Sequence, residues 1–171
     1  MADKPRLPGG MDFAPRPPSG EFSIRKLYVK DVSFETPNTP AVFAAEWRPD
    51  TDVNLRTSVV QIEPGEFEVT LAITLTVKVG ERTAFLAEVQ QAGIFAIVGL
   101  TRQELESVVG AYCPAILYPY ARELVSSLVS RGGFPPFVLA PVNFDALYEQ
   151  QRSDRAAAPS AADPAAPDGA G

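Results

Sequence analysis

Residues 66–79, EFEVTLAITLTVKV, place a large apolar side chain at every second position and Glu, Thr, Ala or Lys between them. This alternation is typical of an antiparallel strand with one face buried and the other in water. Gly80-Glu81 follows as a two-residue hairpin loop, which predicts a second strand from about residue 82 to residue 92. Pro64-Gly65 is typical of a type II turn, so a third strand at about 54–62 is expected to return into 66–79.

Residues 22–36 predict a fourth strand by the same alternation. A proline-rich crossover, residues 37–53, connects it to the next strand and is long for a simple connection. One face of the fourth strand is expected to hold Phe22, Ile24, Tyr28, Val32 and Phe34, and the other Leu27, Val29, Asp31 and Glu35.

The chain beyond residue 100 is expected to be helical. A capping box at Thr101–Glu104 predicts a helix start, because its hydroxyl and carboxylate satisfy amides that lack partners in the first turn. A longer helix is expected with Pro114 in its first turn and Gly132-Gly133 at its end, while Pro119 removes one backbone hydrogen bond or marks a kink. A short helix at about 143–151, capped by its first residue, closes the domain. Its inward side chains are expected to be Phe144, Leu147 and Tyr148.

Apolar side chains cover two adjoining stripes of the longer helix, which is more than one sheet face needs. Part of this surface is therefore expected to contact another subunit. The residues that we assign to such an oligomer interface are Tyr120, Leu124 and Leu128.

Both ends of the chain are expected to be disordered tails. Residues 1–20 are rich in Pro and Gly, and residues 153–171 consist mainly of Ala, Pro, Asp and Gly. Neither segment offers enough large apolar side chains to offset the entropy lost on ordering its backbone. We therefore expect one domain, residues 21–152, between the two tails.

The composition narrows the possible functions. The 171 residues include no His, which excludes Ser-His-Asp and Cys-His nucleophiles and imidazole metal ligands. The single Cys113 cannot form an intramolecular disulfide or a thiolate zinc site, which favours a reducing compartment and a buried, unreactive role. A net charge of −6 argues against nucleic acid or anionic lipid as the partner. Because no membrane-spanning run or signal peptide is evident, we expect a cytoplasmic protein without direct membrane insertion.

Catalysis is not expected. The sequence contains no glycine-rich phosphate loop, metal-ligand cluster or nucleophile elbow, so no cofactor and no metal are predicted. Asp31 and Glu35 could in principle perform acid-base chemistry, but a solvated carboxylate pair on a strand face explains them better. An enzyme using these two carboxylates would need an enclosed pocket around them.

Large aromatic side chains occur in the connections, where they have two interpretations. Phe43 and Trp47 lie in the crossover, and Phe134 and Phe137 follow the end of the long helix. Such residues usually fold back onto the core. Alternatively, the two connections form the walls of a hydrophobic groove for an extended apolar ligand. Spacing alone leaves both interpretations open.

Several stretches of the sequence resemble, in order and spacing, the SecB family of protein-export chaperones, and they extend over nearly all of residues 22–152. They are LYVKDVSFETPN at 27–38, TAFLAEVQQAGIF at 83–95, GAYCP at 110–114, LYPYAR at 117–122 and LAPVNFDAL at 139–147.

The resemblance implies an α+β fold, in which a long helix and a short C-terminal helix pack on one face of a four-stranded antiparallel sheet. It also implies a homotetramer built as a dimer of dimers. The implied function is that of a cytoplasmic, ATP-independent holdase, which binds unfolded precursor proteins, keeps them competent for translocation and delivers them to the SecA ATPase.

The resemblance also assigns two sets of site residues. The implied SecA-docking surface consists of Asp31, Glu35, Leu86 and Glu88. The strand alternation agrees, because it puts Asp31 and Glu35 on the wet face opposite Phe34, and Leu86 and Glu88 on the wet face opposite Phe85. The implied client-binding groove lies between the crossover and the loop after the long helix, and its candidates are Phe43, Trp47, Phe134 and Phe137. The alternative hypothesis is a structural β-sheet module that binds a folded partner through a sheet edge.

Overall fold

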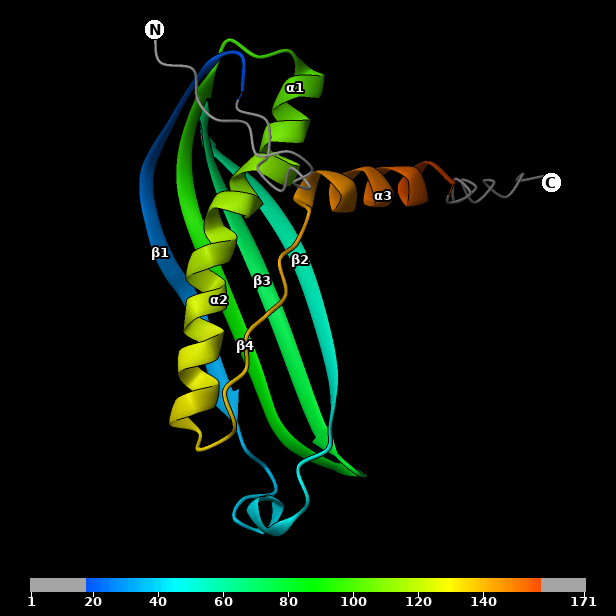
Figure 1. Ribbon diagram of the computed structural model, residues 1–171. Coiled ribbons are helices and arrows are strands. Elements are labelled where there is room, and N and C mark those ends of the chain that lie inside the picture. Colours follow the sequence, from blue (N-terminus) through cyan, green and yellow to red (C-terminus); the bar gives the residue numbers. More distant parts are fainter. Residues whose placement is uncertain (1–17, 158–171) are drawn as a thin grey trace, which may run out of the picture.

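The computed structural model of the protein describes residues 18–157, so most of both predicted tails lies outside the described residues (Figure 1). Four strands form one antiparallel sheet in the order β1-β4-β3-β2. Their bounds are Glu21–Glu35 for β1, Pro49–Glu63 for β2, Glu66–Val79 for β3 and Arg82–Val98 for β4. A long helical segment and a short C-terminal helix lie on one face, which confirms the predicted α+β fold class.

Strand β3 has the predicted bounds, and β4 continues past its predicted end at residue 92 to Val98. The hairpin between them turns at Gly80, whose φ of 59° suits a residue without Cβ. The extension of β4 escaped prediction because residues 92–98, AGIFAIV, are apolar on both faces, so the period-two signal disappears there. Phe95 and Ile97 nevertheless keep the alternation and are buried.

Strand β1 contains two bulges, where one extra residue interrupts the pairing with β4 between Ile24 and Lys26 and again between Val29 and Asp31. Each bulge moves the side chains that follow it to the opposite face. Leu27 and Val29, which pair with Gly93 and Gln91, therefore lie on the helix-covered face, while Tyr28 lies on the other. The predicted faces of these three residues are wrong for this reason.

The second bulge reverses the effect of the first. Beyond it, Phe34 lies on the helix-covered face, and Asp31 and Glu35 lie on the open face, as predicted. No Gly or Pro marks either bulge in the sequence, so the alternation gave no sign of them.

The helices cover what we call the inner face of the sheet (Figure 1). α1, Arg102–Ser107, begins with the predicted capping box, in which Thr101 N donates to Glu104 Oε2 at 2.8 Å. A π-helical turn, Val108–Tyr112, joins it without a break to α2, Cys113–Arg131. The wider turn accommodates Pro114, which cannot donate the usual backbone hydrogen bond. The two helices predicted here thus form one continuous helical segment.

The core lies between the inner face and α2. The apolar stripe of β3 is almost fully buried, from Val69 through Leu75 to Val77, and the facing side chains of α2 include Leu117, Val125 and Val129. No described element covers the opposite face of the sheet, which we call the outer face (Figure 1).

The helical segment ends at Gly132-Gly133, as predicted, and Gly133 adopts a φ of 80°. The chain then runs back over the sheet beside α2 and enters α3, Phe144–Ala157 (Figure 1). Asn143 Oδ1 accepts a hydrogen bond from Ala146 N at 3.0 Å, which confirms the predicted cap. Phe144 is buried, and Leu147 and Tyr148 pack against the core as expected, whereas the far half of α3 extends away from the sheet.

Candidate functional surfaces

The four predicted docking residues lie together on the outer face of the sheet. In the strand register Glu35 is opposite Leu86 and Ser33 is opposite Glu88, while Asp31 is one row further along β1. The three carboxylate side chains are exposed, and Leu86 is half-buried between them. None of the ion pairs of the described chain involves these carboxylates. The surface therefore combines unpaired negative charge with an apolar centre.

This geometry suits binding better than acid-base catalysis. Asp31 and Glu35 are open to water on a flat sheet, whereas a catalytic acid or base needs an enclosed, desolvated site. Within the described residues, no group of three acidic or Cys side chains is placed to hold a metal ion.

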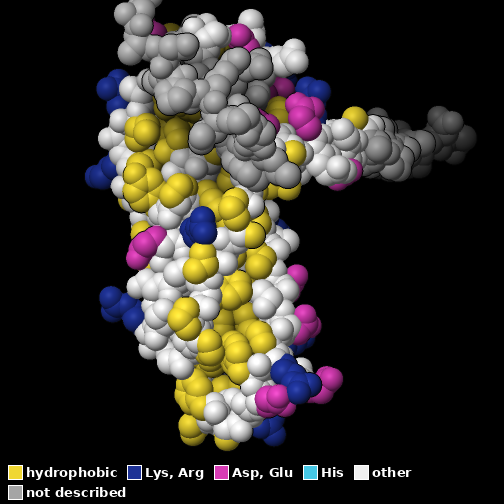
Figure 2. Space-filling model, in the orientation of Figure 1, with side chains coloured by type: hydrophobic (Ala, Val, Ile, Leu, Met, Phe, Trp, Pro, Cys, Tyr) yellow, Lys and Arg dark blue, Asp and Glu magenta, His cyan; other side chains and the backbone are white. Residues whose placement is uncertain are grey.

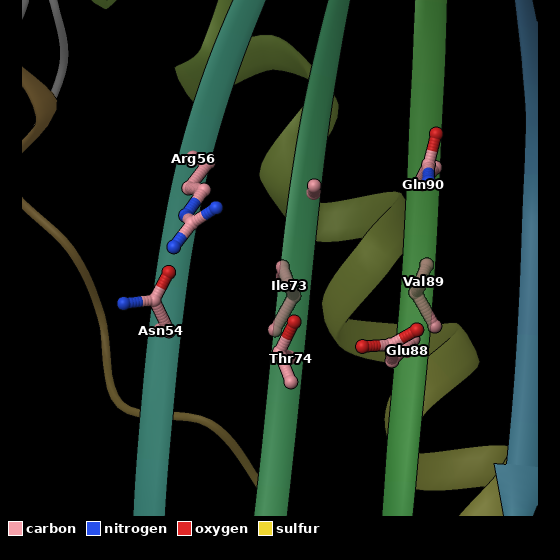
Figure 3. A pocket seen from close by; sticks show the side chains of 8 residues that line it. Asn54, Arg56, Ile73, Thr74, Glu88, Val89 and Gln90 are labelled. Atoms are coloured by element: carbon pink, nitrogen blue, oxygen red, sulfur yellow. The ribbon is translucent and has the colours of Figure 1, made fainter.

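A shallow depression of about 460 Å³ adjoins the predicted docking residues on the same face (Figure 3). It was not predicted from the sequence. Ala72 forms its floor, since its methyl group stands between longer side chains on the neighbouring strands. The polar side chains around it are Asn54 and Arg56 from β2, Thr74 from β3, and Glu88 and Gln90 from β4.

A polar cluster elsewhere on the outer face links β1 to β3 across β4. Tyr28 Oη and Lys30 Nζ both donate hydrogen bonds to the Glu68 carboxylate, and the lysine bond is 2.7 Å long. The bond with Glu68 is the main reason that the pKa of Tyr28 rises to about 12, and burial adds to it. The pKa of Glu68 is lowered, first by Lys30 and then by Tyr28. The bulges in β1 bring these groups together, so sequence alternation could not indicate the cluster.

The aromatic residues of the two connections meet at one end of the sheet. Phe134 is only 5% exposed and lies at the centre, with ring centroids 4.8 Å from Phe85, 5.1 Å from Phe43 and 5.8 Å from Trp47. Phe43 is 51% exposed, and Trp47 is half-buried. The two interpretations of these side chains thus apply to different residues: Phe134 completes the core, and Phe43 stays available at the surface.

An open cavity of about 430 Å³ lies over this cluster, lined by Phe43, Trp47 and Phe134 together with Val42, Ala45, Gly133 and Pro135. Phe137, the fourth predicted groove residue, does not line it. Phe137 is half-buried further along the chain, where its carbonyl oxygen accepts a hydrogen bond of 2.7 Å from Ser126 Oγ. Figure 2 shows apolar side chains continuing from this end of the molecule along the helix-covered face.

A second apolar hollow, of about 260 Å³, lies between α3, the π-helical turn and β2, and it was not predicted from the sequence. Val59 of β2, Val109 of the π-helical turn and Tyr148 of α3 contribute its apolar walls. Because Tyr148 packs closely over Gly110, α3 shapes this hollow directly. Together with the cavity at the aromatic cluster, it provides separate apolar sites on one chain.

Two of the three predicted oligomer-interface residues form part of a larger apolar surface. Tyr120 is 51% exposed, and with Leu124 it lines a hollow of about 470 Å³ that also includes Leu27 and Val29 of β1. Leu128 is half-buried one turn further along α2 and does not line this hollow. Ile24, Val29 and Val32 continue the exposed apolar surface along the edge strand β1.

The remaining predicted feature is Cys113, which is fully buried at the start of α2. Burial raises the pKa of its thiol to about 12, so the thiol stays protonated and unreactive. Among residues 18–157, none of the helices has the length and apolar character needed to cross a membrane.

Comparison with known proteins gives a consistent result. The family described as "Preprotein translocase subunit SecB" matches residues 16–155. A "Protein-export protein SecB" from Methylococcus capsulatus is 60% identical over 134 residues, which cover 78% of this chain and 86% of that protein. A solved structure with the same fold is the SecB-like chaperone Rv1957 of Mycobacterium tuberculosis in complex with a ChAD peptide from the HigA1 antitoxin. Its TM-score is 0.59 at 21% sequence identity, and the match covers 71% of this chain and 90% of that chain. The chain therefore belongs to the SecB family.

Proposed function

We propose that this protein is an ATP-independent holdase chaperone that binds non-native precursor proteins in the cytoplasm and delivers them to the SecA ATPase for export. The observation that carries the proposal is the SecB family match over residues 16–155, together with 60% identity to a protein-export SecB. The exposed apolar cavities and the acidic outer face support the two contacts that this function needs.

The aromatic cavity is suited to binding an apolar side chain of an unfolded client. Burying one large apolar side chain contributes about 1.5–3 kcal/mol, whereas association costs about 4–15 kcal/mol before any net affinity appears. A single cavity beside Phe43 and Trp47 therefore binds weakly and releases quickly. Several cavities joined in one assembly raise the avidity by about 10²–10⁴.

A homotetramer, built as a dimer of dimers, would join the cavities in this way. The exposed apolar surface formed by α2 and the edge of β1, with Tyr120 at its centre, supports this assembly because such a surface is unusual on a protein that stays monomeric. Self-association therefore serves client binding as well as the stability of the subunit.

The outer face is suited to a different partner. Asp31, Glu35 and Glu88 complement a basic segment on SecA, and Leu86 supplies an apolar contact at the centre. Because these carboxylates are exposed, salt screens their attraction, and docking should weaken as ionic strength rises. Since the holdase itself uses no nucleotide, SecA supplies the energy that drives client release.

The combined substitution of Asp31→Lys and Glu88→Lys tests this separation of surfaces. SecA binding, measured by calorimetry, is expected to be lost, while suppression of aggregation of a slowly refolding client remains near the wild-type level. A matched control, Glu63→Lys with Glu81→Lys, reverses one exposed acid at the end of β2 and one in the turn between β3 and β4, and should leave both activities unchanged. Equal loss of both activities in the docking variant would refute the proposal.

The alternative, a structural module that binds a folded partner through a sheet edge, is not favoured by membership of a chaperone family. The two functions differ in their dependence on the folding state of the bound protein. A holdase binds an unfolded polypeptide and ignores the same polypeptide once it has folded.

A further inference from the structure

Arg56 introduces a positive charge next to the acidic docking surface. It lies on β2, exposed on the outer face, opposite Ala72 of β3. Of the other cations on this face, Lys30 pairs with Glu68 at 2.7 Å and Arg25 with Glu66 at 3.6 Å. Lys26 and Lys78 lie on the same face, further from the depression, and take part in no ion pair of the described residues. Arg56 takes part in none of the ion pairs found among residues 18–157. Its guanidinium is therefore available to a partner.

The surroundings of Arg56 favour an anion over the depression. Ala72 leaves a hollow between Arg56 and Gln90, which occupy the same row across three neighbouring strands (Figure 3). The Gln90 amide, the Thr74 hydroxyl and the Asn54 amide can each donate a hydrogen bond into this space. Glu88 lies on the neighbouring row. Its negative charge would repel a bound anion and so keep it on the Arg56 side of the hollow.

The same row continues to the docking surface, because Gln90 pairs with Asp31 of β1. Arg56 and Asp31 are thus separated by three inter-strand spacings, or about 14 Å. A partner that offered only basic groups to this face would be attracted by Asp31 and repelled by Arg56. Like charges placed opposite one another cost binding free energy, so such a partner would fit poorly.

We propose that Arg56, with Gln90, Thr74 and Asn54, binds a carboxylate side chain on the docking segment of SecA. This inference rests on the proposed function, because it takes the outer face as the SecA-docking surface. The segment then presents a basic group to Asp31 and an Asp or Glu side chain to Arg56, about 14 Å apart across the strands. Matching both charges fixes the orientation of the segment and rejects peptides that are basic throughout.

Substitutions at Arg56 test the inference with purified full-length protein and SecA at low salt. Arg56→Glu is expected to weaken SecA binding about tenfold or more, because the carboxylate then faces an anion, while Arg56→Lys keeps most of the affinity. Arg131→Glu, the same charge reversal at the exposed end of α2, is the matched control and should bind SecA like the wild type. Client capture should be unchanged in all three variants, which shows that each is folded.

A second arm identifies the proposed carboxylate. Each Asp and Glu of the SecA docking segment is changed to its amide, and binding is measured to the wild type and to Arg56→Gln. One amide variant should weaken binding to the wild type and have no further effect on binding to Arg56→Gln, as expected for a directly interacting pair.

The outcomes separate this inference from the proposed function. If Arg56→Glu binds SecA as tightly as the wild type, or more tightly, while Asp31→Lys weakens binding, the carboxylate site is wrong and the docking surface stands. If Asp31→Lys also leaves SecA binding unchanged, the docking function of the outer face is wrong as well. If no amide variant in SecA couples to Arg56, the inference is overturned.

Discussion

At the residue scale, one buried amide stabilises the bulge that orients the proposed docking residues. Gln91 is 4% exposed on the inner face, and its Nε2 donates a hydrogen bond of 3.0 Å to the backbone oxygen of Tyr28. This oxygen lies next to the second bulge of β1, where pairing with β4 is interrupted. Because that bulge directs Asp31 to the outer face, Gln91 supports the proposed docking surface from the opposite side of the sheet.

Replacing Gln91 by Leu is expected to destabilise the fold, because the Tyr28 carbonyl loses this donor in a partly buried position. The loss should lower the free energy of unfolding by about 1–3 kcal/mol, measured as a shift of the urea midpoint. Gln90→Leu is the matched control, since Gln90 is the preceding residue but lies on the outer face, where a substitution changes stability by about 0.5 kcal/mol or less. Equal midpoints for the two variants would contradict the role given to Gln91.

At the scale of elements, sequence patterns predicted what repeats regularly and missed what interrupts a regular structure. The alternation in residues 66–79 predicted β3 to its bounds, and the capping box predicted the start of α1. The bulges of β1 could not be predicted from the sequence, because each depends on pairing with β4 rather than on a local residue type. The π-helical turn before Pro114 likewise joined two helices that local signals separated.

The contact between α3 and the π-helical turn gives a prediction of its own. A Cβ atom on Gly110 would come within 2.5 Å of Tyr148 Cδ2, so Gly110→Ala should push the Tyr148 ring away and weaken the docking of α3. Overpacking of this kind costs about 1–3 kcal/mol. Amide hydrogen exchange in residues 144–152 should accelerate at least about fivefold, while exchange in β3 stays slow.

Ser107→Ala, an exposed change in the same helical segment, is the control for this experiment and should leave exchange in α3 unchanged. If α3 in Gly110→Ala exchanges at the wild-type rate, Tyr148 does not hold the helix in place. The apolar hollow beside Val59 and Val109 would then need another explanation for its shape.

At the scale of the whole molecule, each candidate surface combines residues from separate strands and loops, and no single sequence pattern predicts that they lie together. The position of Asp31 and Glu35 on the outer face could be predicted because both stand on one regular stretch of strand, whereas their docking role, with Leu86 and Glu88, was implied by the family resemblance and stays a prediction. Arg56 could not be related to Asp31 from the sequence, since no local turn signal indicates that β1 pairs with β4. Phe137 was assigned to the groove because the resemblance puts the groove at the loop after the long helix, but this part of the loop lies beside α2 and does not line the cavity.

The last prediction concerns the assembly. Tyr120→Asp places a charge in the exposed apolar surface of α2 and β1, and burying that charge against another subunit is costly. Light scattering should therefore find the wild type at four chain masses and the variant at two or one. The variant should also hold an unfolded client about 10²-fold less tightly, because its cavities are no longer joined.

Ser130→Asp adds the same charge to an exposed position of α2 outside this surface and should remain tetrameric with full client affinity. A variant that becomes smaller yet keeps its client affinity would show that avidity does not drive holding, and a wild type that stays monomeric in the presence of client would remove the physical basis of the proposed function.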